Sequence, residues 1–305
     1  MVTTGIPGVM RLRNSFMPAV ASGAPSRSLH ANNPCMDRRR FVALAAAALT
    51  CRPAAAQQKR SLKDPLRVGV DAGLIDSGLA PALQKAFFGD TGVLVVLVPG
   101  AALPVLEALE RGELDAALTN APDAEAKLEN KGLVHDRHTI ALGSHVIVGP
   151  APTAKSFDPA GIARVSDVTE ALTRLRDAAI AAPGTVRFLS AGDGSGTHAA
   201  EQALWRAAHI APAAPWYAAA TAGTPLLAQA RQQSAYALVE RGVWMAQGGK
   251  PLALLVEGDA ALAAPVHVMR PFRVNHPAGK IFVAWIAGPK GRQVVGALRA
   301  YRVPS

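Results

Sequence analysis

The stretch FLSAGDGSGTHAAE, residues 188–201, holds three glycines, an aspartate, two serines, a threonine and a histidine between an apolar run and a helical run. Glycine lets the backbone turn sharply and approach a ligand closely. Amides at the start of a helix have no partner within the helix, and with the helix dipole they favour an anion. We therefore expect a helix from about Thr197 and a cradle of donors before it. The cradle residues are Ser190, Asp193, Gly194, Ser195, Gly196 and Thr197.

A catalytic role for the same loop is disfavoured. A nucleophile elbow has the pattern Gly-x-Ser-x-Gly, whereas glycines directly precede and follow Ser195. Asp193 and His198 are too close in sequence to Ser195 to form an orienting triad easily, because triad partners normally come from separate elements. The simpler alternative is that Asp193 or Ser195 caps the helix. Capping explains one of these residues, but not the density of glycines and hydroxyls.

Strand-like and helix-like segments alternate on both sides of this loop. Residues 66–70 predict a buried strand, and 77–88 predict a helix that begins at or near Ser77. Such alternation is typical of an α/β fold with a mostly parallel sheet covered on both faces. Further strands are expected over 93–98, 114–119, 145–148, 235–239 and 266–269, and further helices over 104–111, 124–131, 168–180, 197–208, 224–233, 276–285 and 291–300.

Residues 151–167 are rich in Pro, Ala and Gly and predict a connection to a second α/β unit. Two such units joined by more than one crossing place a cleft between them. Clefts at domain junctions are where small ligands bind.

The sequence from Met36 predicts an export signal. Three arginines are followed by a short apolar stretch, 41–50, and by an A-x-A cleavage site that ends at Ala56. The apolar stretch is about half of the ~20 residues that a membrane span needs. Residues 38–42 resemble the twin-arginine export pattern, so the export route stays open. Lipidation at Cys51 is the alternative to cleavage after Ala56.

We therefore expect residues 1–56 to comprise an upstream segment and a signal peptide, and the mature product to be periplasmic. Both cysteines, Cys35 and Cys51, fall in this part, so no disulfide is expected. Seven of the 32 basic and one of the 22 acidic residues precede Gln57, which leaves 25 against 21, a formal charge of +4. Without a basic run interleaved with aromatic residues, nucleic-acid binding is not expected.

Five blocks of residues follow one another in a characteristic order, and in this order they resemble the tungstate-binding proteins of bacterial ABC importers. The similarity runs from about Leu66 to Leu298. The blocks are Ser190-x-x-Asp193-x-Ser195-Gly196-Thr197-His198 with Trp205, then Trp216-Tyr217, Ala235-Tyr236-x-Leu238-x-Glu240-Arg241-Gly242, Leu255-Val256-Glu257-Gly258-Asp259 and Phe282-x-x-Trp285-Ile286-x-Gly288-Pro289-x-Gly291.

The resemblance implies a two-lobed periplasmic binding protein fold, type II-like, with two Rossmann-like α/β lobes. It implies crossings near 145–150 and 257–259, an oxyanion held between the lobes, and an ABC transporter permease as partner of a monomer. The expected limits are 57–147 and 257–305 for lobe 1, and 148–256 for lobe 2.

Three departures from the family concern the ligand. Val70-Asp71-Ala72-Gly73 stands where the family has a Thr-Thr-Thr-Ser run, and Ala191 stands where an arginine is usual. The loop with glycine and glutamine has become Ala101-Ala102-Leu103-Pro104. A donor to a charged oxygen contributes ~1.5–3 kcal/mol, so we expect the loss of several donors to weaken tungstate binding by orders of magnitude. Asp71 would also repel a dianion directly.

Asp71, Ala72 and Gly73 are nevertheless candidate ligand-binding positions at the end of the first strand. Asp71 could instead bind a cation or an amine, or serve as a turn residue. Arg241 either donates to an oxyanion in the cleft or pairs with Glu240 or Glu257.

Metal sites are not expected, because two candidate pairs lack a third ligand at useful spacing. They are His135 with His138, and His198 with Glu201. A surface or capping role fits these side chains better.

The sequence thus predicts an exported solute-binding protein without enzymatic activity or cofactor, with tungstate or molybdate as the first candidate ligands. The lobes would close on the ligand, and the helices from Thr197 and from near Ser77 would both point their N-termini into the cleft. Two alternatives stay open. One is the same fold with another ligand or a sensor role, and the other is an enzyme that uses His198 or Asp71 as general base.

Overall fold

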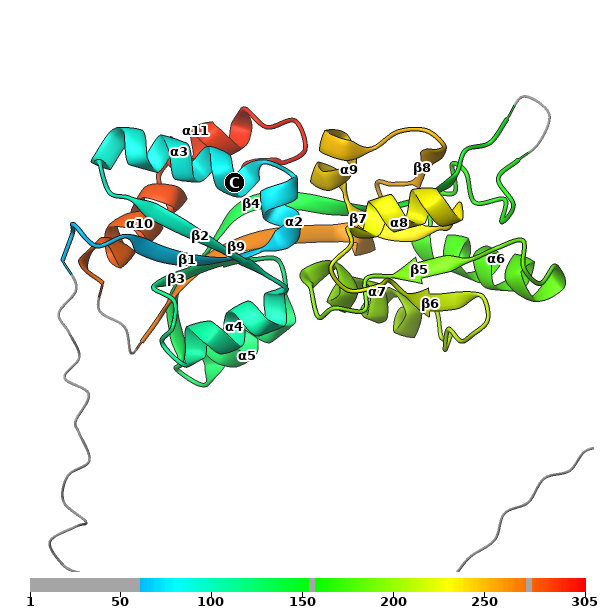
Figure 1. The fold of residues 1–305 in the computed structure, drawn as a ribbon, viewed down its shortest axis with the longest axis horizontal. Coiled ribbons are helices and arrows are strands. Elements are labelled where there is room, and N and C mark those ends of the chain that lie inside the picture. The colour runs from blue at the N-terminus through cyan, green and yellow to red at the C-terminus, as the bar shows by residue number, and fades with distance from the viewer. Residues whose placement is uncertain (1–60, 154–156, 273–275) are drawn as a thin grey trace, which may run out of the picture. The chain divides into compact units, whose positions relative to one another are not determined.

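A computed structural model describes residues 61–153, 157–272 and 276–305 (Figure 1). They belong to one unit of the chain, 58–305, and the description below concerns this unit alone. The predicted signal peptide, with its cleavage and lipidation sites, lies outside the described residues. Within those residues, no helix combines the length and the apolar character needed to cross a bilayer.

The first strand, β1 (Leu66–Asp71), is central to lobe 1. Its side chains from Val68 to Asp71 are buried, and it pairs in parallel with β2 (Val95–Gly100) and β3 (Ala116–Thr119). Apolar runs of this length favour strands that are covered on both faces. The helices of lobe 1 are α2 (Ala72–Asp76), α3 (Leu79–Thr91), α4 (Ala102–Glu110), α5 (Pro122–Asn130), α10 (Pro277–Ala287) and α11 (Pro289–Gly296).

Lobe 2 contains a second set of strands and helices. β5 (Phe188–Ser190) pairs in parallel with β6 (Tyr217–Ala219). β7 (Ala237–Glu240) and β8 (Leu252–Val256) both pair with β4, a strand shared with lobe 1. The helices of lobe 2 are α6 (Val168–Ala181), α7 (Gly196–Ala207), α8 (Leu226–Gln233) and α9 (Arg241–Gln247).

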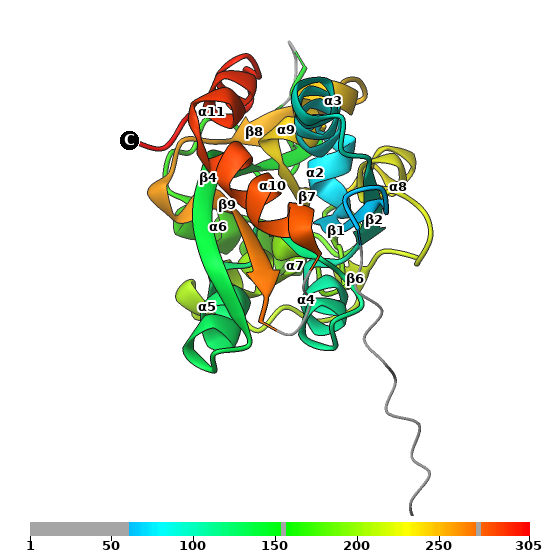
Figure 2. The ribbon, with the colours of Figure 1, turned by 90° about the vertical axis from the view of Figure 1, so that its left-hand side faces the viewer.

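Two long strands run between the lobes. β4 (Val134–Pro150) pairs antiparallel with β9 (Ala263–Pro271) along its first part, up to Ser144, and with β7 and β8 after it. Figure 2 shows β4 and β9 side by side, with α10 next to them. The strand order of the larger sheet is β2-β1-β3-β9-β4-β7, with β8 also on β4. The lobes are thus joined through sheet hydrogen bonds as well as through loops.

The predicted strands and helices are present, with three differences. The sheet is mixed rather than mostly parallel, because β9 pairs antiparallel with both β3 and β4. β4 begins at Val134, eleven residues before the predicted start, in a segment whose charged residues hide its strand character. The helix expected from near Ser77 is α3, which begins at Leu79 after Gly78 at φ 83°, and a short helix that was not predicted, α2, precedes it.

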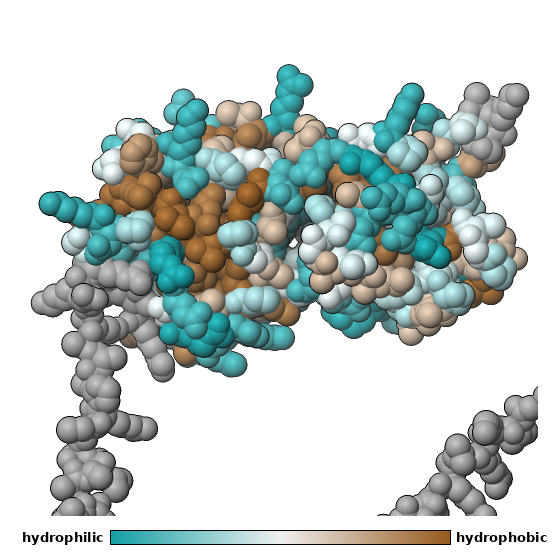
Figure 3. Space-filling model, in the orientation of Figure 1, coloured by the Kyte–Doolittle hydropathy of each residue, from teal (hydrophilic) through white to brown (hydrophobic). Residues whose placement is uncertain are grey.

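Each lobe has its own apolar core. Lobe 1 buries Val68, Leu83 and Phe282 with their neighbours, and lobe 2 buries Leu175, Trp205 and Tyr236 with theirs. Figure 3 shows apolar residues gathered on one face of lobe 1. The buried apolar side chains of each core hold that lobe together independently of the residues at the junction.

Candidate functional site

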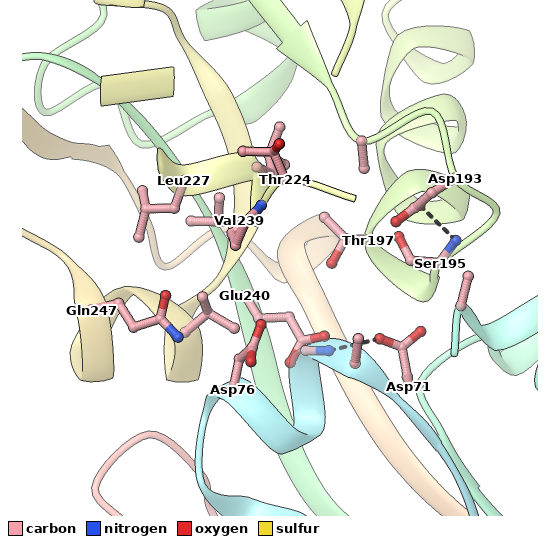
Figure 4. A pocket seen from close by; sticks show the side chains of 17 residues that line it. Asp71, Asp76, Asp193, Ser195, Thr197, Thr224, Leu227, Val239, Glu240 and Gln247 are labelled. Atoms are coloured by element: carbon pink, nitrogen blue, oxygen red, sulfur yellow. Dashed lines mark hydrogen bonds between the residues drawn. The ribbon is translucent and has the colours of Figure 1, made fainter. Parts of the chain in front are cut away.

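A cavity of about 190 Å³ lies at the junction of the lobes (Figure 4). It is smaller than the ~300–1,000 Å³ typical of pockets for drug-sized ligands, so it suits a ligand of a few heavy atoms. Its lining comes from the end of β1 and from α2 in lobe 1, and from α7, α8, α9 and the ends of β5 and β7 in lobe 2. The lining residues are Asp71, Ala72, Gly73, Asp76, Ala101, Ala191, Asp193, Ser195, Thr197, Thr224, Pro225, Leu226, Leu227, Val239, Glu240, Val243 and Gln247.

On the side of lobe 1, Asp71 ends β1 and caps α2. Its Oδ1 accepts a hydrogen bond from the amide of Gly73 at 3.1 Å. The short helix α2 therefore presents its first turn to the cavity. No residue of α3, the helix predicted from near Ser77, is among the lining residues, so α2 lines the cavity in its place. Ser77 instead accepts a hydrogen bond from the hydroxyl of Tyr301 at 2.7 Å.

On the side of lobe 2, the glycine-rich loop precedes α7. Ser195 Oγ accepts a hydrogen bond from the amide of His198 at 3.1 Å and is the N-cap of the helix. Asp193 Oδ1 accepts from the amide of Ser195 at 2.9 Å. His198 Nδ1 accepts from the amide of Gly194 at 3.1 Å. The capping role considered for Ser195 is therefore real, and two amides of the predicted cradle, those of Gly194 and Ser195, are used within the loop itself.

A third amide of the cradle is used across the junction. The amide of Gly196, the first residue of α7, donates to Asp71 Oδ2 at 3.1 Å. The two residues are 125 apart in sequence. The side chain of Asp71 is 1% exposed and holds one amide from each lobe. A carboxylate of the chain itself thus lies where sequence reasoning placed the ligand.

Six of the ten predicted binding residues line the cavity, and four do not. Ser190 is buried at the end of β5, and Gly194 lies beside Leu103 of lobe 1. Arg241 forms an ion pair with Glu257, one of the two roles considered for it, and does not line the cavity. That any of these residues binds a ligand stays a prediction. The six lining residues are Asp71, Ala72, Gly73, Asp193, Ser195 and Thr197.

Gly196 shows why the loop needs glycine at that position. A Cβ atom there would collide with Asn120 Oδ1 of lobe 1. Gly73 is similar, since its Cβ would collide with the carboxyl of Glu240 in lobe 2. These glycines allow close approach of the two lobes rather than of a ligand.

Sequence reasoning missed Glu240 as a site residue. It ends β7, is 5% exposed, and its Oε1 accepts a hydrogen bond from Asn120 Nδ2 at 2.7 Å. Asp71 likewise ends a strand, and ligands of α/β folds bind at the carboxyl ends of strands. A polar residue at the last position of an apolar strand was the signal that could have pointed to Glu240. Asp76, Thr224 and Gln247 carried no such signal.

The lining of the cavity is acidic. Its lining includes four carboxyl groups, Asp71, Asp76, Asp193 and Glu240, and no lysine, arginine or histidine is among these lining residues. In Figure 4, Asp71, Asp76 and Glu240 occupy one side of the cavity and Leu227 and Thr224 another.

Burial shifts three of the carboxyls, those of Asp71, Asp76 and Glu240, toward their neutral forms. Burial raises the pKa of Asp71, against the lowering effect of its amide hydrogen bonds with Gly196 and Gly73. Burial, and then the charge of Asp71, raise the pKa of Glu240 to about 8. Burial also raises the pKa of Asp76. The donors that remain in the lining are hydroxyls and the Gln247 side-chain amide.

Among the residues that the structure describes, no group of three or more His, Cys, Asp or Glu side chains could hold a metal ion. Glu201 accepts hydrogen bonds from the hydroxyl of Tyr217 at 2.7 Å and from Trp205 Nε1 at 3.2 Å. The ring of His135 lies 5.4 Å from that of Phe272.

Two α/β lobes that share long strands and enclose a small cavity define the two-lobed periplasmic binding protein fold. The chain belongs to the PBP superfamily, because the PBP_like_2 family model, a PBP superfamily domain, matches residues 62–290. It is 27% identical over 264 residues to the tungstate-binding protein TupA of Peptoclostridium acidaminophilum, an alignment that covers 84% of this chain and 88% of the relative.

Solved structures agree with this assignment of the fold. The tungstate ABC transporter structure from Geobacter sulfurreducens is 29% identical with a TM-score of 0.65, and the match covers 77% of this chain and 98% of that one. TupA of Desulfovibrio alaskensis G20 is 26% identical with a TM-score of 0.62, covering 79% of this chain and 100% of that one.

Proposed function

We propose that this protein is the solute-binding component of an ABC importer and that it takes a small oxyanion into the cavity between its lobes. The observation that carries the proposal is the cavity itself, which is small and lined from both lobes. A ligand that touches both lobes favours their closed arrangement, which a membrane permease can recognise. The relatives that bind tungstate make tungstate and molybdate the first ligands to test.

The hydroxyls in the lining support the choice of a small polar ligand. Ser195, Thr197 and Thr224 place hydroxyl groups around the cavity, and Leu227 and Val239 cover its other side. Hydroxyls donate to oxyanion oxygens without a net charge. The proposed binding residues remain the six that line the cavity, with Gly194 and Gly196 shaping the loop.

We further propose that the protein is exported to the periplasm, acts as a monomer and catalyses no reaction. Ser195 Oγ caps a helix, and His198 Nδ1 accepts a hydrogen bond from an amide, so neither is arranged as nucleophile and base. The lobe limits 57–147 with 257–305, and 148–256, stay a prediction.

A thermal-shift and calorimetry screen tests the proposal. The purified protein is titrated at pH 7 with tungstate, molybdate, sulfate and phosphate, with magnesium and ethylamine as controls of opposite charge. We expect saturable stabilisation by at least one oxyanion, since a ligand that binds only the folded state stabilises it by RT ln(1 + [L]/Kd). Stabilisation by none of the four, or by the cations alone, contradicts the proposal.

A further inference from the structure

The carboxylate of Asp71 has the contacts of a bound anion. It is 1% exposed, it accepts hydrogen bonds from the amides of Gly73 and Gly196, and these amides begin α2 and α7. The starts of helices are the places where a fold offers amide donors to an anion. One side chain therefore occupies donors of both lobes.

The groups around Asp71 do not neutralise it. Glu240 at the end of β7, Asp76 in α2 and Asp193 in the loop after β5 are the ionisable side chains that line the cavity with it. All three are acids and no base is among the lining residues, so a second anion would meet repulsion from Asp71 with no positive charge of this lining to offset it. Burial strengthens such repulsion because it lowers the local dielectric constant.

Two further hydrogen bonds join the lobes near Asp71. Asn120 Nδ2 of lobe 1 donates to Glu240 Oε1 of lobe 2 at 2.7 Å. The amide of Leu103 in lobe 1 also donates to the carbonyl of Gly194 in lobe 2, at 3.1 Å. These bonds hold the two lobes together with Asp71 on its amide donors.

We propose that Asp71 is the specificity-determining residue of the cavity, a tethered anion that occupies the oxyanion donors and selects for oxyanions that carry a proton. This inference rests on the proposed function. It assigns the ligand to the class of hydrogen oxyanions, such as phosphate at neutral pH, rather than to fully deprotonated dianions such as tungstate, molybdate and sulfate.

The chemistry of hydrogen bonding supports this selection. An ionised carboxylate accepts hydrogen bonds and donates none. A hydrogen oxyanion can donate its proton to Asp71, and this charge-assisted bond offsets part of the repulsion. A dianion without a proton cannot form this bond, so it must displace Asp71 from the amides of Gly73 and Gly196 or lie beside a negative charge with only the neutral donors of the lining.

Calorimetric titration of the wild type and of Asp71→Asn with phosphate and with tungstate at pH 7 tests the inference. The variant removes the charge, keeps the shape and leaves one acceptor oxygen. We expect the wild type to bind phosphate more tightly than tungstate, and the variant to gain about 10- to 100-fold in tungstate affinity, the worth of one charged hydrogen bond. Phosphate affinity should fall, so that the order of the two ligands reverses.

Asp76→Asn is the matched control. It removes a carboxyl from the same cavity, but Asp76 accepts neither of the amide hydrogen bonds that Asp71 accepts, so we expect a clearly smaller gain in tungstate affinity than in Asp71→Asn. If the Asn variant at position 71 does not fold, Asp71→Ser gives the same comparison, because serine also serves as an N-cap for α2.

The outcomes separate this inference from the proposed function. Tight binding of tungstate by the wild type, with no gain in Asp71→Asn, overturns the inference and leaves the importer role intact. An equal gain in Asp76→Asn also overturns it, because the effect would then be general charge and not occupancy of the donors. Binding of no oxyanion by any variant contradicts the proposed function itself.

Discussion

Replacement of Glu240 by glutamine should remove most of the pH dependence that the cavity contributes to stability. The carboxyl is buried and its pKa is raised from 4.5 to about 8, by burial first and then by the charge of Asp71. Between these values the folded chain holds a proton that the unfolded chain has lost. Stability therefore falls as the pH rises through this range and is constant above it.

The magnitude follows from the width of that range. Each pH unit changes the free energy of unfolding by about 1.4 kcal/mol. From pH 5.5 to 7.5 the free energy of unfolding of the wild type should therefore fall by about 3 kcal/mol, and that of Glu240→Gln should not. The variant keeps the oxygen that accepts from Asn120 Nδ2. An unpaired Nε2 in the variant would lower its stability by a constant amount, so the slope with pH is the diagnostic quantity.

The assay is urea unfolding at several pH values between 5 and 8.5, with the free energy of unfolding compared between variant and wild type. Glu113→Gln is the control, since Glu113 is exposed and pairs with Arg111 outside the cavity. Its slope should differ little from that of the wild type. Parallel curves for Glu240→Gln and the wild type would refute the reasoning, because Glu240 would then be ionised in the folded protein at neutral pH.

Three further predictions concern other parts of the molecule. Burial raises the pKa of Glu125, but the effects of His267, Thr119 and Arg137 together outweigh it and the net shift is downward. Glu125→Gln should therefore lower stability at pH 7 by about 3 kcal/mol. In the same urea titrations, the difference from the wild type should shrink as the pH falls through the range in which this carboxyl takes up its proton. Gly196→Ala should keep the melting temperature within a few degrees but weaken ligand binding at least tenfold in calorimetry, because its Cβ collides with Asn120 and keeps the lobes apart; unchanged affinity would contradict this. Arg241→Gln should leave oxyanion affinity unchanged and cost less than about 1 kcal/mol, because it removes only a half-exposed ion pair; a large loss of affinity would restore this arginine as a ligand donor.

Local features of the site followed from the sequence alone. The start of α7 at Gly196 and its capping by Ser195 depend on residues within three positions of one another. The buried strand β1 was evident from its own apolar run, and Asp71 at its end was evident as a departure from the family pattern. Such features are determined by short-range sterics and hydrogen bonds, so a single sequence carries them.

Only the tertiary structure decided which side chains and amides of the chain meet at the cavity. Asp71 accepts a hydrogen bond from the amide of Gly196, which is 125 residues away in the sequence. Glu240 accepts one from Asn120, which is 120 residues away. The antiparallel pairing of β4 with β9 joins segments more than 100 residues apart, and the alternation of helices and strands predicted parallel neighbours instead. No local pattern encodes which distant carboxylate reaches an amide, because that depends on how two cores pack against a shared pair of strands. The sequence by itself therefore determined that amide donors lie at the start of a helix after the glycine-rich loop. Only the folded chain decided that Asp71 accepts a hydrogen bond from one of them, the amide of Gly196.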